Sequence, residues 1–405
     1  MSFRRTRSSR LEEKTRRRAH FTQTESSLSS VSSNQSHASR KEHKIGHFLS
    51  YLGSRNPLPA SIAADDVVWL MDNVAVRGAG GGWEAEFVTA VFDHKPSAKV
   101  VDIVGDIASK VHLSKGSQEE KTIEQRIGPF VMEVLPGRQV KVNFNGSTPL
   151  KLGPGGRNGI STDVRKLPGA HAGSIVKSTA DVPMGVMGVL AMRTVYAEPE
   201  GWAVISDIDD TIKITQTSDP VGILRSTFVS EPTPVPGMPE LYSQISDLLT
   251  LSAPFFYLSA SPYNLYPFLC NFRNAHYPHG QLVLRDASWM TVSGLLSNLT
   301  LGTEKYKVSR IRKIRSWLPR RKLICIGDST QSDPEAYGAA CRAFPGWIKL
   351  ILIRKVADVA AVGIEEKNEP SRFEKAFEGV PRGVWHVFND PAECWPVIQK
   401  TVADN

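Results

Sequence analysis

"VISDIDDTIKIT", residues 204–215, places three acidic residues within four positions directly after an apolar run. Asp207, Asp209 and Asp210 repel one another, and burying a carboxylate beside an apolar strand is costly unless its charge is compensated. The stretch therefore predicts a buried strand that ends at a site which needs these acids.

The sequence from residue 199 onward alternates apolar strand-like runs with helical stretches. We expect strands at 202–209, 254–262, 280–286, 322–329 and 347–353. We expect helices at 238–249, 263–274, 307–318 and 333–344. Continuous apolar strands with intervening helices indicate a parallel sheet covered on both faces, so residues 199–405 are predicted to form an α/β domain. In such sheets, polar residues just past the carboxyl ends of the strands mark the site.

Acidic side chains follow two of these strands. Asp207 and Asp209 end the first one, and Asp328 and Asp333 lie where the strand at 322–329 leads into a helix. Four carboxylates that converge on one edge need a cation, and a hard divalent ion with oxygen ligands, above all Mg²⁺, meets that need. We therefore predict that these four residues bind Mg²⁺, with the alternative that Asp333 is only a helix N-cap.

The spacing of the first acids suits phosphoryl transfer. Asp207 is expected to attack phosphorus and form an aspartyl phosphate. Asp209, two positions later, is expected to protonate the leaving oxygen and then deprotonate the hydrolytic water. Thr211 is expected to fix the substrate-binding loop through its hydroxyl. Asp210 is expected to hydrogen-bond locally or to face solvent, without a catalytic role.

A transferring phosphoryl group also needs fixed donors and cations around its oxygens. Ser259, at the end of an expected strand, supplies a hydroxyl, and Ser261 is its alternative. Lys307, at the expected start of a helix, supplies the cation, and Lys305 is its alternative. We predict that Ser259 and Lys307 are catalytic residues that bind the phosphoryl oxygens.

These motifs together resemble those of the haloacid-dehalogenase-like phosphatases. "DIDDT" (207–211) resembles their DxDxT first motif, Ser259 their second and Lys307 their third. "GDSTQSD" (327–333) resembles their acidic fourth motif. The resemblance implies a Rossmann-like catalytic domain of that class.

Longer segments narrow the resemblance. "PGMPELY", "FFYLSASPYNL", "GDSTQSDPEAY" and "FEKAFEGVPRGVWHVF" (373–388) resemble the fungal actin-patch phosphatidate phosphatases, which are related to the lipins at the catalytic domain. "VWLMDNVAVRGAGGGWEAEFVTAVF" (68–92) resembles the β-rich region that precedes that domain in the family. The resemblance covers residues 60–395 and leaves out the N-terminal tail.

This resemblance implies Mg²⁺-dependent conversion of phosphatidate to diacylglycerol and phosphate at a membrane surface, with cortical actin-patch proteins as partners. Family members often carry Pro-rich C-terminal tails, whereas this sequence ends at Asn405, so we do not expect partners that read PxxP segments. Two alternatives stay open. One is a catalytically inactive module that binds phosphatidate or phosphoinositide, and the other is a phosphatase for a soluble or protein phosphoester. The residues alone argue only for phosphoryl transfer.

The region before the catalytic domain has a β-rich pattern. We predict an antiparallel β-sandwich-like or barrel domain over residues 46–198, with a short leading helix at 45–53. Its expected strand regions are 66–78, 84–94, 130–146 and 185–197. The glycine-rich "RGAGGGW" (77–83) lies between strands and is predicted to be a hairpin loop, not a phosphate cradle.

Residues 1–45 are basic and Ser-rich, and we expect them to be disordered. The first twenty residues carry eight Arg and Lys against two Glu, which leaves the rest of the chain nearly neutral and argues against a nucleic-acid partner. The tail could also be a mitochondrial presequence, a polybasic clamp for anionic lipid or a phosphorylation-controlled segment.

The remaining sequence predicts a cytoplasmic protein that associates peripherally with membranes. The longest apolar runs are too short to cross a bilayer, and the four scattered cysteines indicate free thiols in a reducing compartment. The basic residues between 310 and 322 form either a solvated face or a patch that docks on anionic lipid. His276 and His279 have zinc-like spacing without further ligands, so we interpret them as loop residues.

Overall fold

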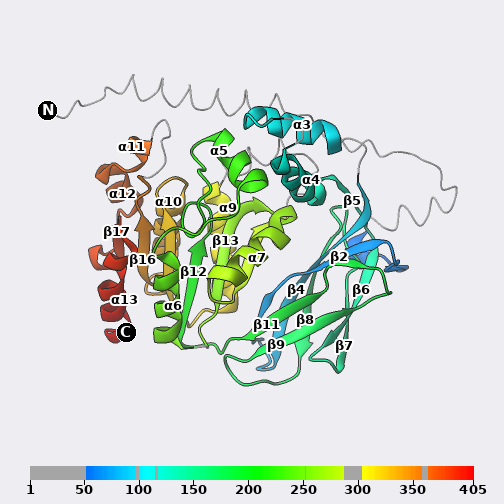
Figure 1. Ribbon diagram of the computed structural model, residues 1–405. Helices are drawn as coiled ribbons and strands as arrows, with labels where there is room; N and C mark the ends of the chain where they lie inside the picture. Colours follow the sequence, from blue (N-terminus) through cyan, green and yellow to red (C-terminus); the bar gives the residue numbers. More distant parts are fainter. Residues whose placement is uncertain (1–51, 97–99, 115–116, 251, 287–302, 358–363) are drawn as a thin grey trace.

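The computed structural model describes residues 52–96, 100–114, 117–250, 252–286, 303–357 and 364–405. Within these ranges the chain forms two sheets that lie side by side (Figure 1). The predicted tail (1–45) and most of the predicted leading helix (45–53) lie outside the described residues, so both stay predictions.

The C-terminal sheet contains six parallel strands in the order β14-β13-β12-β15-β16-β17. Five of them confirm the predicted strands: β12 (Trp202–Asp207), β13 (Phe255–Pro262), β14 (Gln281–Arg285), β15 (Lys322–Asp328) and β16 (Ile348–Arg354). The sequence pattern does not predict β17 (Trp385–Phe388), because this short strand is only partly buried and has no apolar run. The chain starts in the middle at β12, moves outward to β14 and returns to β15, so β12 and β15 flank the crevice where doubly wound sheets bind ligands.

Helices cover both faces of this sheet, as predicted. On one face, a shared apolar core joins the sheet to α6 (Met238–Leu249), α7 (Tyr266–His276) and α13 (Cys394–Ala403). On the other face, a second core joins it to α9 (Thr303–Trp317), α10 (Asp333–Ala343) and α12 (Pro370–Ala376). The short α11 (Ile364–Lys367) precedes α12. Neighbouring residues of β12 alternate between the two cores, as the period of a strand requires.

The N-terminal sheet contains eleven described strands, and its main path runs β1-β6-β9-β11-β3-β4-β2-β10. Its strands are β1 (Ala60–Ser61), β2 (Asp66–Leu70), β3 (Asn73–Arg77), β4 (Trp83–Pro96), β5 (Met132–Val134), β6 (Arg138–Phe144), β7 (Thr148–Leu152), β8 (Ile160–Leu167), β9 (Ile175–Asp181), β10 (Met187–Val189) and β11 (Ala191–Tyr196). Strands far apart in this order enclose one apolar core, which includes Phe87 and Phe144. This is the predicted sandwich-like layer, and residues 77–83 form the predicted hairpin connection between β3 and β4.

Two features of this region differ from the prediction. Three of its strand pairs are parallel, namely β1–β6, β10–β2 and β11–β3, so the layer is not purely antiparallel. Two helices, α3 (Val100–Lys110) and α4 (Gln118–Val131), interrupt the strands. A helical signal is present in the sequence, since Ile103 and Ile107, and likewise Ile123 and Ile127, are four residues apart and buried.

Helices α3 and α4 contact the segment that follows β12. This segment contains the short α5 (Pro220–Leu224) and a π-helical turn, Arg225–Val229, and it lies next to α3 and α4 in Figure 1. Arg126 of α4 donates to the carbonyls of Thr227 and Ser230 and pairs with Glu231 at 2.8 Å. Helix α4 of the N-terminal region therefore holds a helical segment that follows the first strand of the C-terminal sheet.

A buried ion pair also joins the two sheets. Asp72, which follows β2, lies 2.7 Å from Arg273 of α7, and both side chains are buried. Tyr266 accepts a hydrogen bond from the Asp72 N–H at 2.8 Å. The predicted boundary at 198/199 falls between β11 and β12, but the residues on its two sides share one continuous apolar core. The division into two domains stays a prediction.

Candidate active site

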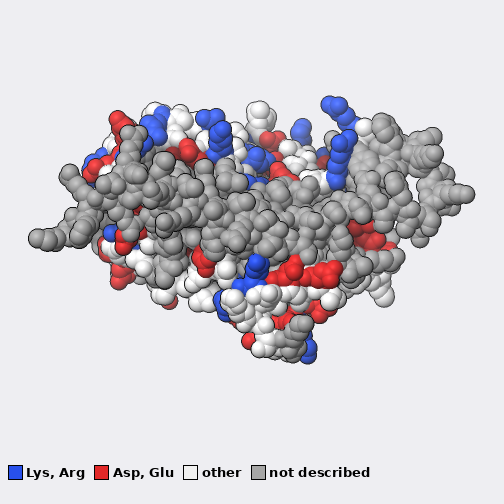
Figure 2. Space-filling model, turned by 90° about the horizontal axis from the view of Figure 1, so that it is seen from above, with Lys and Arg blue, Asp and Glu red and all other residues white. Residues whose placement is uncertain are grey.

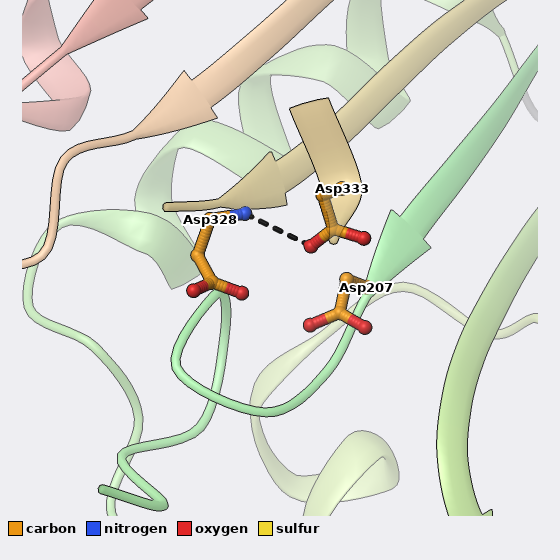
Figure 3. Close-up of side chains that lie close together, drawn as sticks. All are labelled: Asp207, Asp328 and Asp333. Carbon is orange, nitrogen blue, oxygen red and sulfur yellow. Dashed lines mark hydrogen bonds between the residues drawn. The ribbon is translucent and has the colours of Figure 1, made fainter. Parts of the chain in front are cut away.

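Three buried carboxylates gather at the carboxyl ends of β12 and β15. Asp207 is the last residue of β12, Asp328 is the last of β15, and Asp333 is the first of α10. Their oxygens lie within 4.8 Å of one another (Figure 3). Asp333 folds back on β15, since it accepts a hydrogen bond from the Asp328 N–H at 3.1 Å. Gly327 permits this approach, because a Cβ there would lie 2.6 Å from the Asp333 Cβ.

Asp333 is not the helix N-cap that the alternative interpretation proposed. Ser332 occupies that position, and the carboxylate of Asp333 points into the acidic group (Figure 3). That alternative is therefore wrong.

Lys307 is the lysine of this group. Its Nζ lies 2.6 Å from Asp207 Oδ1 and also pairs with Asp333. Helix α9 begins at Thr303, ahead of the predicted start, so Lys307 lies within the helix and not at its opening. Lys307 is fully buried, whereas Lys305 is exposed. The structure thus brings Lys307 to the acids and leaves Lys305 at the surface.

The crowding of buried negative charge shifts the pKa values of Asp207, Asp328 and Lys307. Burial, and next the carboxylate of Asp333, raises the pKa of Asp207 well above its usual range. The same two causes raise the pKa of Asp328 to about 6. Burial alone would lower the pKa of Lys307, but the facing carboxylates outweigh it and raise this pKa. One ammonium group therefore faces three carboxylates, and two of them, Asp207 and Asp328, resist ionisation.

A divalent cation fits this group. Asp207, Asp328 and Asp333 offer hard oxygen ligands, the kind that Mg²⁺ and Ca²⁺ prefer. With all three ionised, Lys307 offsets only one of the negative charges. A bound cation would neutralise the excess.

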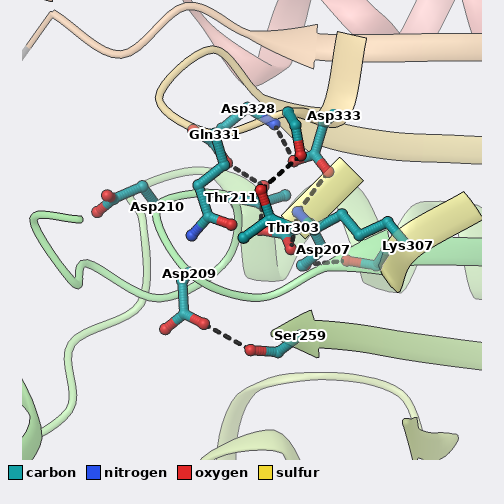
Figure 4. A network of polar contacts seen from close by, with 12 residues as sticks. Asp207, Asp209, Asp210, Thr211, Ser259, Thr303, Lys307, Asp328, Gln331 and Asp333 are labelled. Atoms are coloured by element: carbon teal, nitrogen blue, oxygen red, sulfur yellow. Dashed lines mark hydrogen bonds and ion pairs between the residues drawn. The ribbon is translucent and has the colours of Figure 1, made fainter. Parts of the chain in front are cut away.

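The carboxylate of Asp209 lies outside the acidic group. Its Oδ2 accepts hydrogen bonds from the hydroxyls of Ser259 at 2.6 Å and Ser261 at 3.2 Å, and its Oδ1 accepts one from Thr215 at 2.8 Å. Figure 4 shows it directed toward Ser259 and away from Asp333. The structure therefore does not bring the Asp209 side chain to the predicted metal ligands. It brings both candidate serines to Asp209.

Asp210 organises the loop after β12. Its backbone is left-handed, with φ of 62°, and its carboxylate accepts the N–H groups of Thr215, Gln216 and Thr217 at 2.7–2.9 Å. The local hydrogen bonding predicted for Asp210 is confirmed. Arg354, at the end of β16, donates to the Asp210 carbonyl at 2.9 Å and supports the same loop.

Thr211 connects two members of the acidic group. Its hydroxyl lies 3.2 Å from Asp207 Oδ2 and 3.4 Å from Asp328 Oδ2 (Figure 4). The predicted loop-fixing hydroxyl is therefore in place between the two strand ends.

Lys213 and Thr215 are site residues that the sequence reasoning missed. Both are buried, and Lys213 Nζ donates to Thr215 Oγ1 at 2.9 Å. A signal was present, because Thr211, Lys213 and Thr215 alternate with isoleucines, and alternate residues of an extended segment share one side.

The basic residues between 310 and 322 largely have partners inside the protein. Lys313 pairs with Glu86 of β4 at 2.5 Å, and the buried Arg321 donates to the Glu198 carbonyl at 2.7 Å. Cation–π contacts engage others at 5.8 Å or less: Arg310, Arg315 and Lys322. These contacts favour a structural role over lipid docking for these residues.

The described face seen in Figure 2 carries both signs of charge, with Lys and Arg and also Asp and Glu visible. Among the residues that the structure describes, every helix is too short or too polar to span a bilayer.

His279 lies in the loop between α7 and β14, as expected, although its ring is only partly exposed. His276 is instead the last residue of α7 and is not in a loop. The His279 ring lies 3.9 Å from Asp72 at the junction of the two sheets, and burial lowers its pKa to about 4. Among the described residues, the candidate group of metal ligands does not include His276 or His279.

The six-stranded parallel sheet, the acids at its central strand ends and the facing lysine together have the arrangement of the haloacid-dehalogenase-like fold. Comparison with protein families agrees and is more specific. Residues 202–355 match the family model described as the phosphatidate phosphatase APP1 catalytic domain.

Two relatives are similar to parts of the chain. The chain is 29% identical over 273 residues to the phosphatidate phosphatase APP1 of Saccharomyces cerevisiae, which is 63% of this chain and 45% of that protein. It is 30% identical over 159 residues to an uncharacterized protein of Schizosaccharomyces pombe, which is 38% of this chain and 25% of that protein. The chain thus matches less than half of the length of either relative.

Proposed function

We propose that this protein is a Mg²⁺-dependent phosphatidate phosphatase that converts phosphatidate to diacylglycerol and phosphate. One observation carries the proposal: the segment that matches the family contains three buried carboxylates and a buried lysine at the central strand ends of its sheet. The name of the Saccharomyces cerevisiae relative supports the lipid substrate.

Asp207 is the proposed nucleophile. Its Oδ1 is held by Lys307 and its Oδ2 by Thr211, so the carboxylate has a defined orientation. Attack of one Asp207 oxygen on phosphorus would form an aspartyl phosphate and break the bond between phosphorus and the diacylglycerol oxygen, so that diacylglycerol leaves. Water would then cleave the aspartyl phosphate and release phosphate. Lys307, Thr211 and Ser259 are the proposed phosphoryl-binding residues.

Asp209 is the proposed general acid and base, which protonates the leaving oxygen and then activates water. Asp207, Asp328 and Asp333 would hold Mg²⁺. When bound, this ion would neutralise charge on the phosphoryl oxygens. The side chain of Asp209 faces hydroxyls instead, so we do not assign it to the metal in this arrangement.

We further propose that the protein works in the cytoplasm and associates peripherally with membranes. Support comes from its lipid substrate and from the basic residues of its sequence near the N-terminus. Association with cortical actin-patch proteins stays a prediction.

Phosphate release by the purified full chain tests the function. The substrates are phosphatidate in mixed micelles and the soluble ester p-nitrophenyl phosphate, each with Mg²⁺ or with EDTA. We expect Mg²⁺-dependent release from phosphatidate, and none from the Asp207→Asn variant. Hydrolysis of the soluble ester alone would indicate a phosphatase of the soluble type, and phosphatidate binding without release would indicate an inactive module.

A further inference from the structure

Lys213 is a buried lysine that the proposed mechanism does not use. Its side chain is 1% exposed, and among the described residues it forms no ion pair. Its Nζ donates to Thr215 Oγ1 at 2.9 Å and lies 5.7 Å from the ring centre of Phe268. The carboxylates of Asp209 and Asp210 are near enough to stabilise the charge of Lys213. Burying an ammonium group without a direct ion pair is still costly, so this arrangement calls for an explanation.

The hydrogen bonds of Thr215 have a fixed direction. An ammonium group can only donate, so Thr215 Oγ1 must accept from Lys213 and give its own proton elsewhere. The near acceptor is Asp209 Oδ1 at 2.8 Å, whereas the Lys213 carbonyl lies at 3.4 Å. Lys213 thereby directs the Thr215 proton to Asp209.

The other oxygen of Asp209 is held in the same way. The Ser261 N–H donates to Ser259 Oγ at 2.9 Å, so the Ser259 proton is directed to Asp209 Oδ2 at 2.6 Å. Both oxygens of Asp209 therefore accept from hydroxyls whose orientation is set by a further donor. This arrangement fixes the side-chain rotamer of Asp209.

We propose that Lys213 and Thr215 are positioning residues that hold Asp209 in the orientation needed for acid–base catalysis, acting through the chain of hydrogen bonds Lys213–Thr215–Asp209. The inference rests on the proposed function, in which Asp209 protonates the leaving oxygen. Neither residue needs to touch the substrate.

The hydroxyl of Thr215 can be removed without releasing the loop. The Thr215 backbone N–H is bound by Asp210 Oδ1 at 2.9 Å, and this contact does not involve the side chain. Thr215→Val keeps the shape and removes the hydroxyl, while Thr215→Ser keeps the hydroxyl. Thr233 is an exposed threonine of the same segment, so Thr233→Val is a matched control.

The test compares these variants on two esters. The alcohol of phosphatidate must be protonated as it leaves, whereas p-nitrophenolate can depart without a proton. Acid–base catalysis contributes about 10²–10⁴-fold, so we expect Thr215→Val to lower kcat on phosphatidate about 10–100-fold with little change in KM. We expect the loss on p-nitrophenyl phosphate to be small, Thr215→Ser to restore activity and Thr233→Val to match the unmodified protein.

A double-mutant cycle tests the role of Lys213. Lys213→Met should also lower kcat on phosphatidate, and the double variant with Thr215→Val should be no worse than Thr215→Val alone, because both changes act through one hydrogen bond. Additive losses would overturn the proposed chain. So would an equal loss on both esters, a change in KM alone, or full activity of Thr215→Val.

Failure of the proposed function has a different result. If the unmodified protein hydrolyses p-nitrophenyl phosphate but not phosphatidate, the lipid assignment is wrong, and glycerol 3-phosphate becomes the alkyl ester in the same comparison. Release from none of these esters would refute both proposals.

Discussion

Replacing Lys307 by Met tests the charge balance of the active site. Among the described residues, Lys307 is the one cation paired with Asp207 or Asp333, and all three side chains are fully buried or nearly so. Methionine fills a similar volume without charge. The variant therefore leaves the carboxylates buried and unopposed.

The expected cost is large. Removing one partner of a buried ion pair typically destabilises a protein by about 3–5 kcal/mol, because the remaining charge is left in a poorly solvated place. A divalent ion that binds the folded state only would recover part of this loss. In EDTA we therefore expect Lys307→Met to lower the free energy of unfolding by about 3–5 kcal/mol, and in excess Mg²⁺ by clearly less.

The loss of stability in Lys307→Met should also depend on pH. The pKa values of Asp207 and Asp328 are raised in the folded state, so the folded protein binds protons more tightly there than the unfolded chain. Such groups favour folding increasingly as pH falls through the folded-state pKa. Removing Lys307 raises these pKa values further, so the penalty should be greatest near about pH 8 and smaller near about pH 5.

Urea unfolding of three proteins provides the measurement: the unmodified chain, Lys307→Met and Lys305→Met. Lys305 is exposed and lies two positions earlier on the same helix, so its variant is the matched control and should change stability by less than about 0.5 kcal/mol. Equal stability of the two variants in EDTA near about pH 8 would refute the conclusion that Lys307 stabilises negative charge on the buried carboxylates.

Three further predictions concern other contacts. Asp207→Asn should abolish phosphate release while circular dichroism and the unfolding midpoint in EDTA stay normal or improve, because one crowded carboxylate is removed; retained turnover would exclude the covalent route. The pKa of His279 is lowered to about 4 by burial, so the folded state resists its protonation, and about 3 kcal/mol of stability should be lost as pH falls from about 6.5 to 4. Unfolding of His279→Gln, measured at several pH values, should not show this loss of stability. If the variant and the unmodified chain have the same pH dependence of the free energy of unfolding, the prediction is wrong. Arg126→Ala should speed hydrogen exchange in residues 225–231, because it removes the donor to two carbonyls. The control Glu231→Gln changes an exposed partner and should lower the free energy of unfolding by less than about 1 kcal/mol. Equal exchange in Arg126→Ala and the unmodified chain would show that α4 does not hold this segment.

Local patterns explain why much of the C-terminal sheet and its helices is predictable from the sequence. Buried parallel strands are continuous apolar runs, so β12 to β16 stand out between amphipathic helices. The site residues stand out because acids directly after such a run are costly without a purpose. Helices α3 and α4 were missed, because β-branched residues in a strand-rich neighbourhood outweighed a four-residue spacing of isoleucines.

The sequence by itself determined the parallel fold, the acids at its strand ends and the lysine and serine candidates, because each depends on the order and spacing of nearby residues. Only the tertiary structure decided which acids meet. It groups Asp333 with Asp207 and Asp328, and it turns Asp209 to three hydroxyls. It also joined the two sheets through a buried ion pair between Asp72 and Arg273. The physical reason is that such contacts link residues far apart in the chain, or depend on side-chain direction, and local spacing specifies neither.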